Sequence, residues 1–148
     1  MITDYWRNRP ARILLAEDNR TTARLIEIAL RRTGVTHDLQ TVYDGDSAIA
    51  ALEPGSAGAD LVLLNLHMPG KNGFEVLEHV KRQEHLRRIP VVMFSSSETL
   101  CDVNRAYDLH ANAYVLKRPD FSDLCRSLNS VLQFWLGTAI IPDNSHLR

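Results

Sequence analysis

The chain of 148 residues has the composition of one ordinary globular domain, with 45% hydrophobic and 24% charged residues. That balance excludes a disordered chain, a collagen-like chain and a small protein held together by disulfides. Lys plus Arg number 17 and Asp plus Glu number 18, which gives a formal net charge of -1. Such a near-neutral balance carries no electrostatic signature for nucleic acid or an anionic membrane, and we expect neither as a partner.

The N-terminal segment and the cysteines favour a soluble, cytoplasmic protein. Residues 1–7 lack the apolar segment of a secretory signal, and the longest apolar runs, such as residues 61–64, are far too short to cross a bilayer. The two cysteines, Cys101 and Cys125, are too few for a disulfide framework. We expect both to be reduced.

Short apolar runs alternate with amphipathic stretches along the chain. The apolar runs predict five strands, at residues 12–16, 38–42, 61–64, 91–94 and 113–116. Apolar residues at helical spacing predict five helices, at residues 21–32, 44–52, 73–83, 99–109 and 120–136. The strand at 38–42 has the weakest pattern, and Asp44 after it has the side chain to cap the following helix.

This alternation is typical of an α/β protein with a doubly wound parallel sheet. Right-handed crossovers then join the strands, and helices cover both faces. In such a sheet, ligands bind beyond the carboxyl ends of the strands. Functional residues are therefore expected directly after the strands.

Polar side chains stand at four of these strand ends, and an aromatic residue precedes the last of them. The set consists of Glu17, Asp18, Asn65, His67, Ser95, Tyr114 and Lys117. Each residue alone has an ordinary explanation as a solvated turn, a loop, a core tyrosine or a surface lysine. Together, the oxygen ligands suit Mg²⁺, and a cation, a lysine and a hydroxyl around one point suit a phosphoryl group.

These residues resemble the receiver domain of two-component response regulators. The resemblance lies in residues 13–19, 63–73, 90–95 and 113–117 and extends over about residues 11–136. It implies a flavodoxin-like five-stranded sheet of order 2-1-3-4-5. The chain then divides into an N-terminal extension (1–10), a receiver domain (11–136) and a C-terminal tail (137–148).

The resemblance also implies a role for each residue at the strand ends. Mg²⁺ is bound by Glu17, Asp18, the side chain at position 65 and the backbone carbonyl of His67. Ser95 binds the phosphoryl group and Lys117 pairs with it. Ser95 and Tyr114 form the switch, in which the aromatic ring rotates inward on activation.

Position 65 departs from the family pattern. Receivers carry the phosphate on an aspartate at the end of the third strand, whereas this chain has Asn65. A carboxamide is a far poorer nucleophile than a carboxylate, so we expect no phosphorylation there. Its oxygen can still ligate Mg²⁺ but adds no charge, so we expect weak Mg²⁺ binding.

Two explanations of this substitution compete. The chain is either an engineered variant locked in the unphosphorylated state or a natural receiver that works without phosphorylation. Because Glu17, Asp18, Ser95 and Lys117 are all present, a deliberate or recent substitution is favoured.

Within the family, residues 38–52, 102–107 and 134–136 resemble the single-domain regulators that serve bacterial phytochromes. This implies a histidine kinase of phytochrome type as partner, and a signal relay by protein–protein contact, not an enzyme. The alternative is a phosphorylation-independent binding module that keeps only the receiver surface. A flavodoxin-like enzyme is disfavoured, because no glycine-rich phosphate loop follows the first strand.

The last predicted helix has a wider apolar arc than packing on a sheet requires. We therefore expect a homodimer through the fourth helix, the fifth strand and the last helix. The expected interface residues are Cys125, Leu132, Phe134, Trp135 and Leu136. The alternative is that the tail folds back and covers its own helix.

Overall fold

The strands form one parallel sheet in the predicted order. The computed structural model describes residues 10–143, and within this range five strands pair in the order β2-β1-β3-β4-β5. Every pairing is parallel. The strands are β1 (Ala11–Ala16), β2 (His37–Val42), β3 (Leu61–Leu64), β4 (Val91–Ser95) and β5 (Ala113–Leu116). The predicted flavodoxin-like fold class is therefore confirmed.

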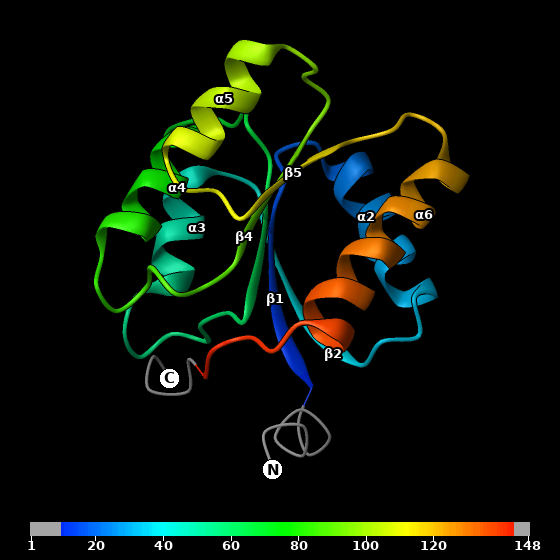
Figure 1. The fold of residues 1–148 in the computed structure, drawn as a ribbon, viewed down its shortest axis with the longest axis horizontal. Helices are drawn as coiled ribbons and strands as arrows, with labels where there is room; N and C mark the ends of the chain where they lie inside the picture. The colour runs from blue at the N-terminus through cyan, green and yellow to red at the C-terminus, as the bar shows by residue number, and fades with distance from the viewer. Residues whose placement is uncertain (1–9, 144–148) are drawn as a thin grey trace.

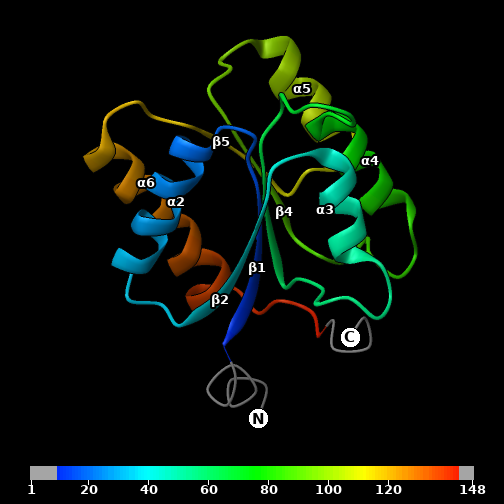
Figure 2. The ribbon, with the colours of Figure 1, turned by 180° about the vertical axis from the view of Figure 1, so that it is seen from behind.

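Helices cover both faces of the sheet. They are α2 (Arg20–Arg32), α3 (Gly45–Leu52), α4 (Gly73–Arg82), α5 (Leu100–Asp108) and α6 (Phe121–Gln133). Helices α3, α4 and α5 lie on one side, and α2 and α6 lie on the other (Figures 1 and 2). The Asp44 side chain accepts a hydrogen bond from the amide of Ser47 at 2.7 Å, so the predicted cap of α3 is confirmed.

The alternation of side chains along the strands builds two apolar layers. In β1, Leu14 and Ala16 join the cluster beneath α3 and α4, whereas Ile13 and Leu15 join the cluster beneath α2 and α6. All four residues of β3 are buried, as the continuous apolar run predicts. Each fully buried leucine contributes about 1.5–3 kcal/mol to the free energy of folding.

Helix α5 is attached to this core by little apolar surface. Of its nine residues, all within the described range, Ala106 alone is buried. Leu100 at its first turn is 72% exposed, and Tyr107 is also exposed. The helix covers the sheet beside β5, an edge strand whose four residues are half-buried.

The end of the last helix differs from the prediction. The sequence pattern predicts α-helix through residue 136, but α6 ends at Gln133 and a π-helical turn, η1 (Phe134–Thr138), follows. The amide of Ala139 donates to the carbonyl of Phe134 at 2.7 Å and closes this wider turn. The apolar pattern continues through this turn, so periodicity alone did not reveal it.

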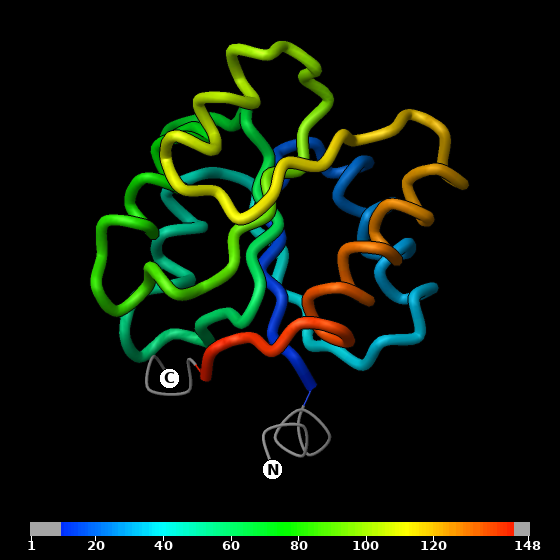
Figure 3. Tube along the Cα trace, viewed as in Figure 1, coloured from blue at the N-terminus to red at the C-terminus, as the bar shows by residue number. Residues whose placement is uncertain are grey.

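The tail crosses the end of the sheet at which the strands begin (Figure 3). Ile141 is buried there, whereas Phe134 and Ile140 remain exposed. The tail therefore folds back over the amino ends of the strands and leaves part of the last helix open. Residues 1–9 of the predicted extension and 144–148 of the predicted tail lie outside the described residues.

None of the helices within residues 10–143 combines the length and the apolarity that crossing a membrane requires.

Gly73 permits a close approach between α4 and the end of β3. A Cβ atom at this position would collide with the carbonyl oxygen of Asn65 and would lie 2.8 Å from Cα of Leu66. At Gly137 the nearest atom to such a Cβ is Oε1 of Gln133, at 3.6 Å. The two glycines therefore form a matched pair for testing backbone crowding.

We predict that Gly73→Ala lowers the free energy of unfolding by about 1–3 kcal/mol, since backbone atoms must move to admit the methyl group. Gly137→Ala is expected to change it by less than about 0.5 kcal/mol. Urea denaturation followed by circular dichroism measures both. Equal midpoints for the two variants would contradict the close approach of α4 to Asn65.

Candidate functional site

A buried ion pair spans the carboxyl end of the sheet. Glu17 follows β1 and is 1% exposed, and Lys117 follows β5. The ammonium of Lys117 pairs with Oε1 of Glu17 and also donates to Oδ1 of Asn65 at 3.2 Å. Asn65 follows β3, which lies between these two strands in the sheet. The structure thus brings together three of the residues that the sequence places at strand ends.

The amide nitrogen of Asn65 lies within hydrogen-bond distance of three oxygen atoms. Nδ2 donates to Oε2 of Glu17 at 3.2 Å, to Oδ1 of Asp18 at 3.0 Å and to the backbone carbonyl of His67 at 2.9 Å. These are the oxygens predicted to ligate Mg²⁺. The prediction for Asn65 requires its amide oxygen to face the same point, whereas in the structure that oxygen faces Lys117.

The three oxygens around Nδ2 of Asn65 are of the kind that a divalent cation prefers. Mg²⁺ commonly takes one or two carboxylates and keeps several waters. Glu17, Asp18 and the carbonyl of His67 fit that pattern. Within residues 10–143, no group of three or more His, Cys, Asp or Glu side chains is placed to hold a metal. The His67 ring itself is exposed.

A second network connects the end of β4 to β5 and α5 through Ser97. Oγ of Ser95, a buried side chain, accepts a hydrogen bond from the amide of Ser97 at 3.1 Å. The Tyr114 hydroxyl donates to the carbonyl of Ser97 at 2.8 Å. The Ser97 hydroxyl donates to Oδ2 of Asp102 at 2.6 Å, and this bond lowers the pKa of the Asp102 carboxyl below its usual value.

Sequence reasoning singled out Ser95 and Tyr114 but missed Ser97 and Asp102. Both predicted switch residues form a hydrogen bond with Ser97, which connects them. The available signal was the position of Ser97 just before Thr99, which caps α5 by accepting from the amide of Asp102. A loop serine beside a helix cap is well placed to bond the first turn of that helix.

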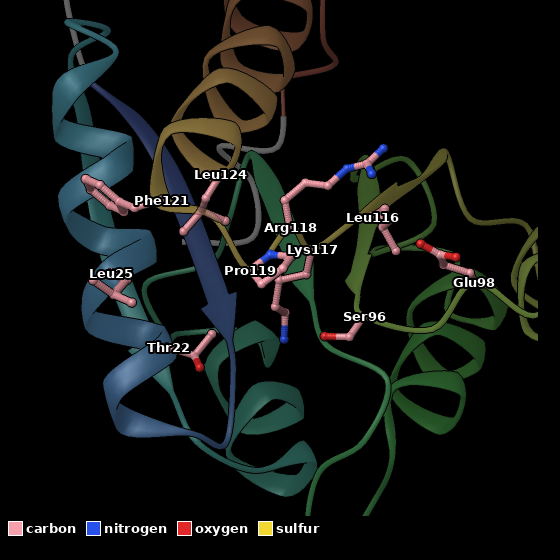
Figure 4. A pocket seen from close by; sticks show the side chains of 10 residues that line it. All are labelled: Thr22, Leu25, Ser96, Glu98, Leu116, Lys117, Arg118, Pro119, Phe121 and Leu124. Atoms are coloured by element: carbon pink, nitrogen blue, oxygen red, sulfur yellow. The ribbon is translucent and has the colours of Figure 1, made fainter.

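An open pocket of about 380 Å³ lies beside Lys117, as Figure 4 shows. Leu25 of α2 and Phe121 and Leu124 of α6 form its apolar side. Ser96 and Leu116 line the side nearer β4 and β5. The pocket therefore joins the polar site to an apolar surface on α2 and α6.

The parallel sheet of order 2-1-3-4-5, with carboxylates, a hydroxyl and a lysine at its carboxyl end, is the arrangement of receiver domains, and the amide at position 65 departs from it. The chain belongs to this family: residues 13–129 match the response regulator receiver domain. Receiver domains act as signal relays, partner histidine kinases and bind divalent metal.

Two cyanobacterial response regulators are similar to this chain over almost all of their length. Response regulator Rcp1 of Synechocystis sp. is 36% identical over 140 residues, which cover 91% of this chain and 95% of Rcp1. Its Mn²⁺-bound structure matches with a TM-score of 0.83 and covers 90% of this chain and 100% of that chain. The phosphorylated cyanobacterial phytochrome response regulator RcpA is 40% identical, with a TM-score of 0.86 and coverage of 91% and 100%.

A regulator named for a different process is also similar. The probable methanogenesis regulatory protein FilR2 of Methanothrix harundinacea is 40% identical over 132 residues, which cover 86% of this chain and 85% of FilR2. Regulators named for different processes therefore share this level of sequence identity with the chain.

We predict that Lys117→Met lowers the free energy of unfolding by about 2–3 kcal/mol, because it leaves the buried Glu17 carboxylate without its counter-charge. Adding Glu17→Gln to that variant is expected to restore more than half of the loss. Arg24→Met is the control, since Arg24 pairs with Glu27 on the exposed surface of α2 at 3.3 Å, and its loss should be below about 1 kcal/mol. Chemical denaturation measures the free energy of unfolding of all three variants. If Lys117→Met is as stable as Arg24→Met, the fold does not depend on the ion pair between Lys117 and Glu17.

Proposed function

We propose that this chain is a single-domain receiver that takes its signal from a phytochrome-type histidine kinase in the cytoplasm and relays it by protein–protein contact. The observation that carries the proposal is the carboxyl end of the sheet, where Glu17, Asp18 and Lys117 contact the Asn65 amide and Ser95 ends the neighbouring strand β4. The similarity to RcpA, a phytochrome response regulator, along the whole of that chain supports the choice of kinase.

The chemistry of position 65 determines what the kinase can do to this form. The amide oxygen of Asn65 is neutral and already accepts a hydrogen bond from Lys117, so it is a poor nucleophile toward phosphorus. The lysine and the Ser95 hydroxyl would otherwise receive a phosphoryl group. Mg²⁺, held weakly by Glu17, Asp18 and the His67 carbonyl, would supply positive charge beside that group. In this form the kinase therefore acts by binding, without phosphate on residue 65.

The contacts of Ser97 support a route from the site to the surface. Its amide contacts Ser95, its carbonyl holds the Tyr114 hydroxyl, and its own hydroxyl holds α5 through Asp102. A displacement of Ser95 therefore reaches both the aromatic ring in β5 and the first turn of α5. In our proposal these two elements present the output surface.

The pocket beside Lys117 supports a docking place for the kinase. A phosphodonor must reach the site, and the apolar side chains of Leu25 and Phe121 lie next to the lysine. Leu25 is exposed although it is a large apolar side chain. Burial of this surface by a partner would stabilise a complex at the mouth of the site.

A phosphorylation-independent binding module is the second candidate. It is favoured by one observation: every polar end of the Asn65 amide already has partners within the protein. Restoration of aspartate separates the two candidates. A receiver recently altered at one position regains phosphotransfer, whereas a module that has lost the chemistry does not.

We predict that the chain takes no phosphate on residue 65 and that Asn65→Asp takes one phosphoryl group in the presence of Mg²⁺. Both forms are incubated with a phosphorylated phytochrome-type kinase or acetyl phosphate, and intact mass measures the product. Asn65→Asp/Lys117→Met is the matched control and should label more slowly, because it lacks the ammonium. Labelling of the Asn65 form elsewhere in the site, or failure of the aspartate form to label, would contradict the proposal.

We further propose a homodimer through α5, β5 and α6. The edge strand β5 is half-buried, and Leu100 and Tyr107 of α5 expose apolar surface beside it. Among the predicted interface residues, Leu132 is fully buried in its own chain, so the contact area comes from the other four. Those residues are Cys125, Phe134, Trp135 and Leu136. A two-fold axis would cover each copy's exposed surface with its own counterpart.

Phe134→Ser/Trp135→Ser is expected to convert the dimer into a monomer of 16.8 kDa that keeps the receiver fold. Leu25→Ser is the control, since this exposed leucine lies outside the proposed interface and its variant should remain dimeric. Light scattering gives the mass and circular dichroism checks the fold. A monomeric mass for the unmodified chain at tens of micromolar would reject the dimer.

A further inference from the structure

We propose that the side-chain amide of Asn65 takes the place of the divalent cation in this site, so that metal binding and the Asn65 network exclude each other. The inference goes beyond the relay function and does not depend on any kinase. It rests on where one nitrogen atom lies and on which atoms face it.

The first step is geometric. Three oxygens from different points of the chain lie 2.9, 3.0 and 3.2 Å from Nδ2 of Asn65. Mg²⁺ binds oxygen at about 2.0–2.1 Å, so a cation shared by these oxygens needs the space between them. The nitrogen stands in that space. A metal therefore enters only if the Asn65 side chain turns or withdraws.

The second step concerns the orientation of the amide. The Lys117 ammonium can only donate, and the two carboxylates and the His67 carbonyl can only accept. With Oδ1 toward Lys117 and Nδ2 toward the three oxygens, every contact of the amide joins a donor to an acceptor, and its two hydrogens are shared among the three oxygens. A turn of the amide would set its N–H groups against the ammonium and its oxygen against three oxygens. Asn65 is 8% exposed, so little water can replace the lost hydrogen bonds.

The third step concerns charge. An aspartate at position 65 would place a third carboxylate beside Glu17 and Asp18 and would offer no hydrogen to either, so a divalent cation among the three would reduce their mutual repulsion. The amide offers two hydrogens and adds no negative charge. Glu17 already has Lys117 as its counter-ion, and Asp18 is exposed to solvent. The site with asparagine is thus complete without metal.

Asn65→Ala distinguishes this inference from the alternative that Asn65 is a metal ligand. The substitution removes both the blocking nitrogen and the amide oxygen that could coordinate. If Asn65 is a ligand, its removal weakens metal binding. If its amide occupies the place of the metal, its removal strengthens metal binding. The two interpretations therefore predict opposite changes in metal affinity.

The experiment is a titration with Mn²⁺ alone, followed by the electron paramagnetic resonance of the free ion, with no phosphodonor present. We expect Asn65→Ala to bind Mn²⁺ at least tenfold more tightly than the unmodified chain, and Asn65→Asp to bind it more tightly still. Asn65→Ala/Asp18→Ala is the matched control and should lose the gain, because it removes one of the freed oxygen ligands. Equal or weaker binding by Asn65→Ala overturns the inference.

A measurement on the unmodified chain keeps the inference testable if Asn65→Ala does not fold. Nuclear magnetic resonance can follow the two side-chain N–H protons of Asn65 during a titration with diamagnetic Mg²⁺. We expect these protons to exchange slowly with water in the metal-free protein and to lose this protection as Mg²⁺ saturates the site. Saturation of the site with their protection unchanged overturns the inference.

Discussion

The burial of the Glu17 carboxylate is the constraint on which the site depends. A charge removed from water must find compensating partners inside the protein. Glu17 finds the ammonium of Lys117, the amide group of Asn65 and the backbone N–H of Asn19. These partners come from the ends of β1, β3 and β5, and the parallel sheet brings these ends to the same edge. A change at position 65 therefore acts on the charge balance of that edge.

The strands with continuous apolar runs were the most predictable elements. The bounds of β3 and β5 agree with the prediction because polar residues end each run abruptly. The signal for β2 was weak, since this edge strand is buried on one side only and its exposure alternates. The end of α6 was not predictable, because the apolar pattern continues unchanged through the π-helical turn that follows Gln133.

The residues of the site were predictable, but their connections were not. Parallel strands bring Glu17, Asn65 and Lys117 to the same edge, so the convergence follows from topology alone. The orientation of the Asn65 amide depends instead on the balance of donors and acceptors around it, which exists only in the folded protein. The role of Ser97 was not predictable for a similar reason. Three consecutive serines look alike in the sequence, and only the contacts of Ser97 with Tyr114 and Asp102 distinguish it from the other two.

The sparse attachment of α5 has a consequence for how motion is distributed in the molecule. A helix that buries one alanine loses little apolar contact when it separates from the sheet, whereas α2 buries four residues in the core. The free energy of local opening should therefore be lowest at α5 and much higher at α2. Thermal fluctuations then concentrate on the helix that Ser97 connects to Ser95. The element that is easiest to displace is therefore one that hydrogen bonds connect to Ser95 at the end of β4.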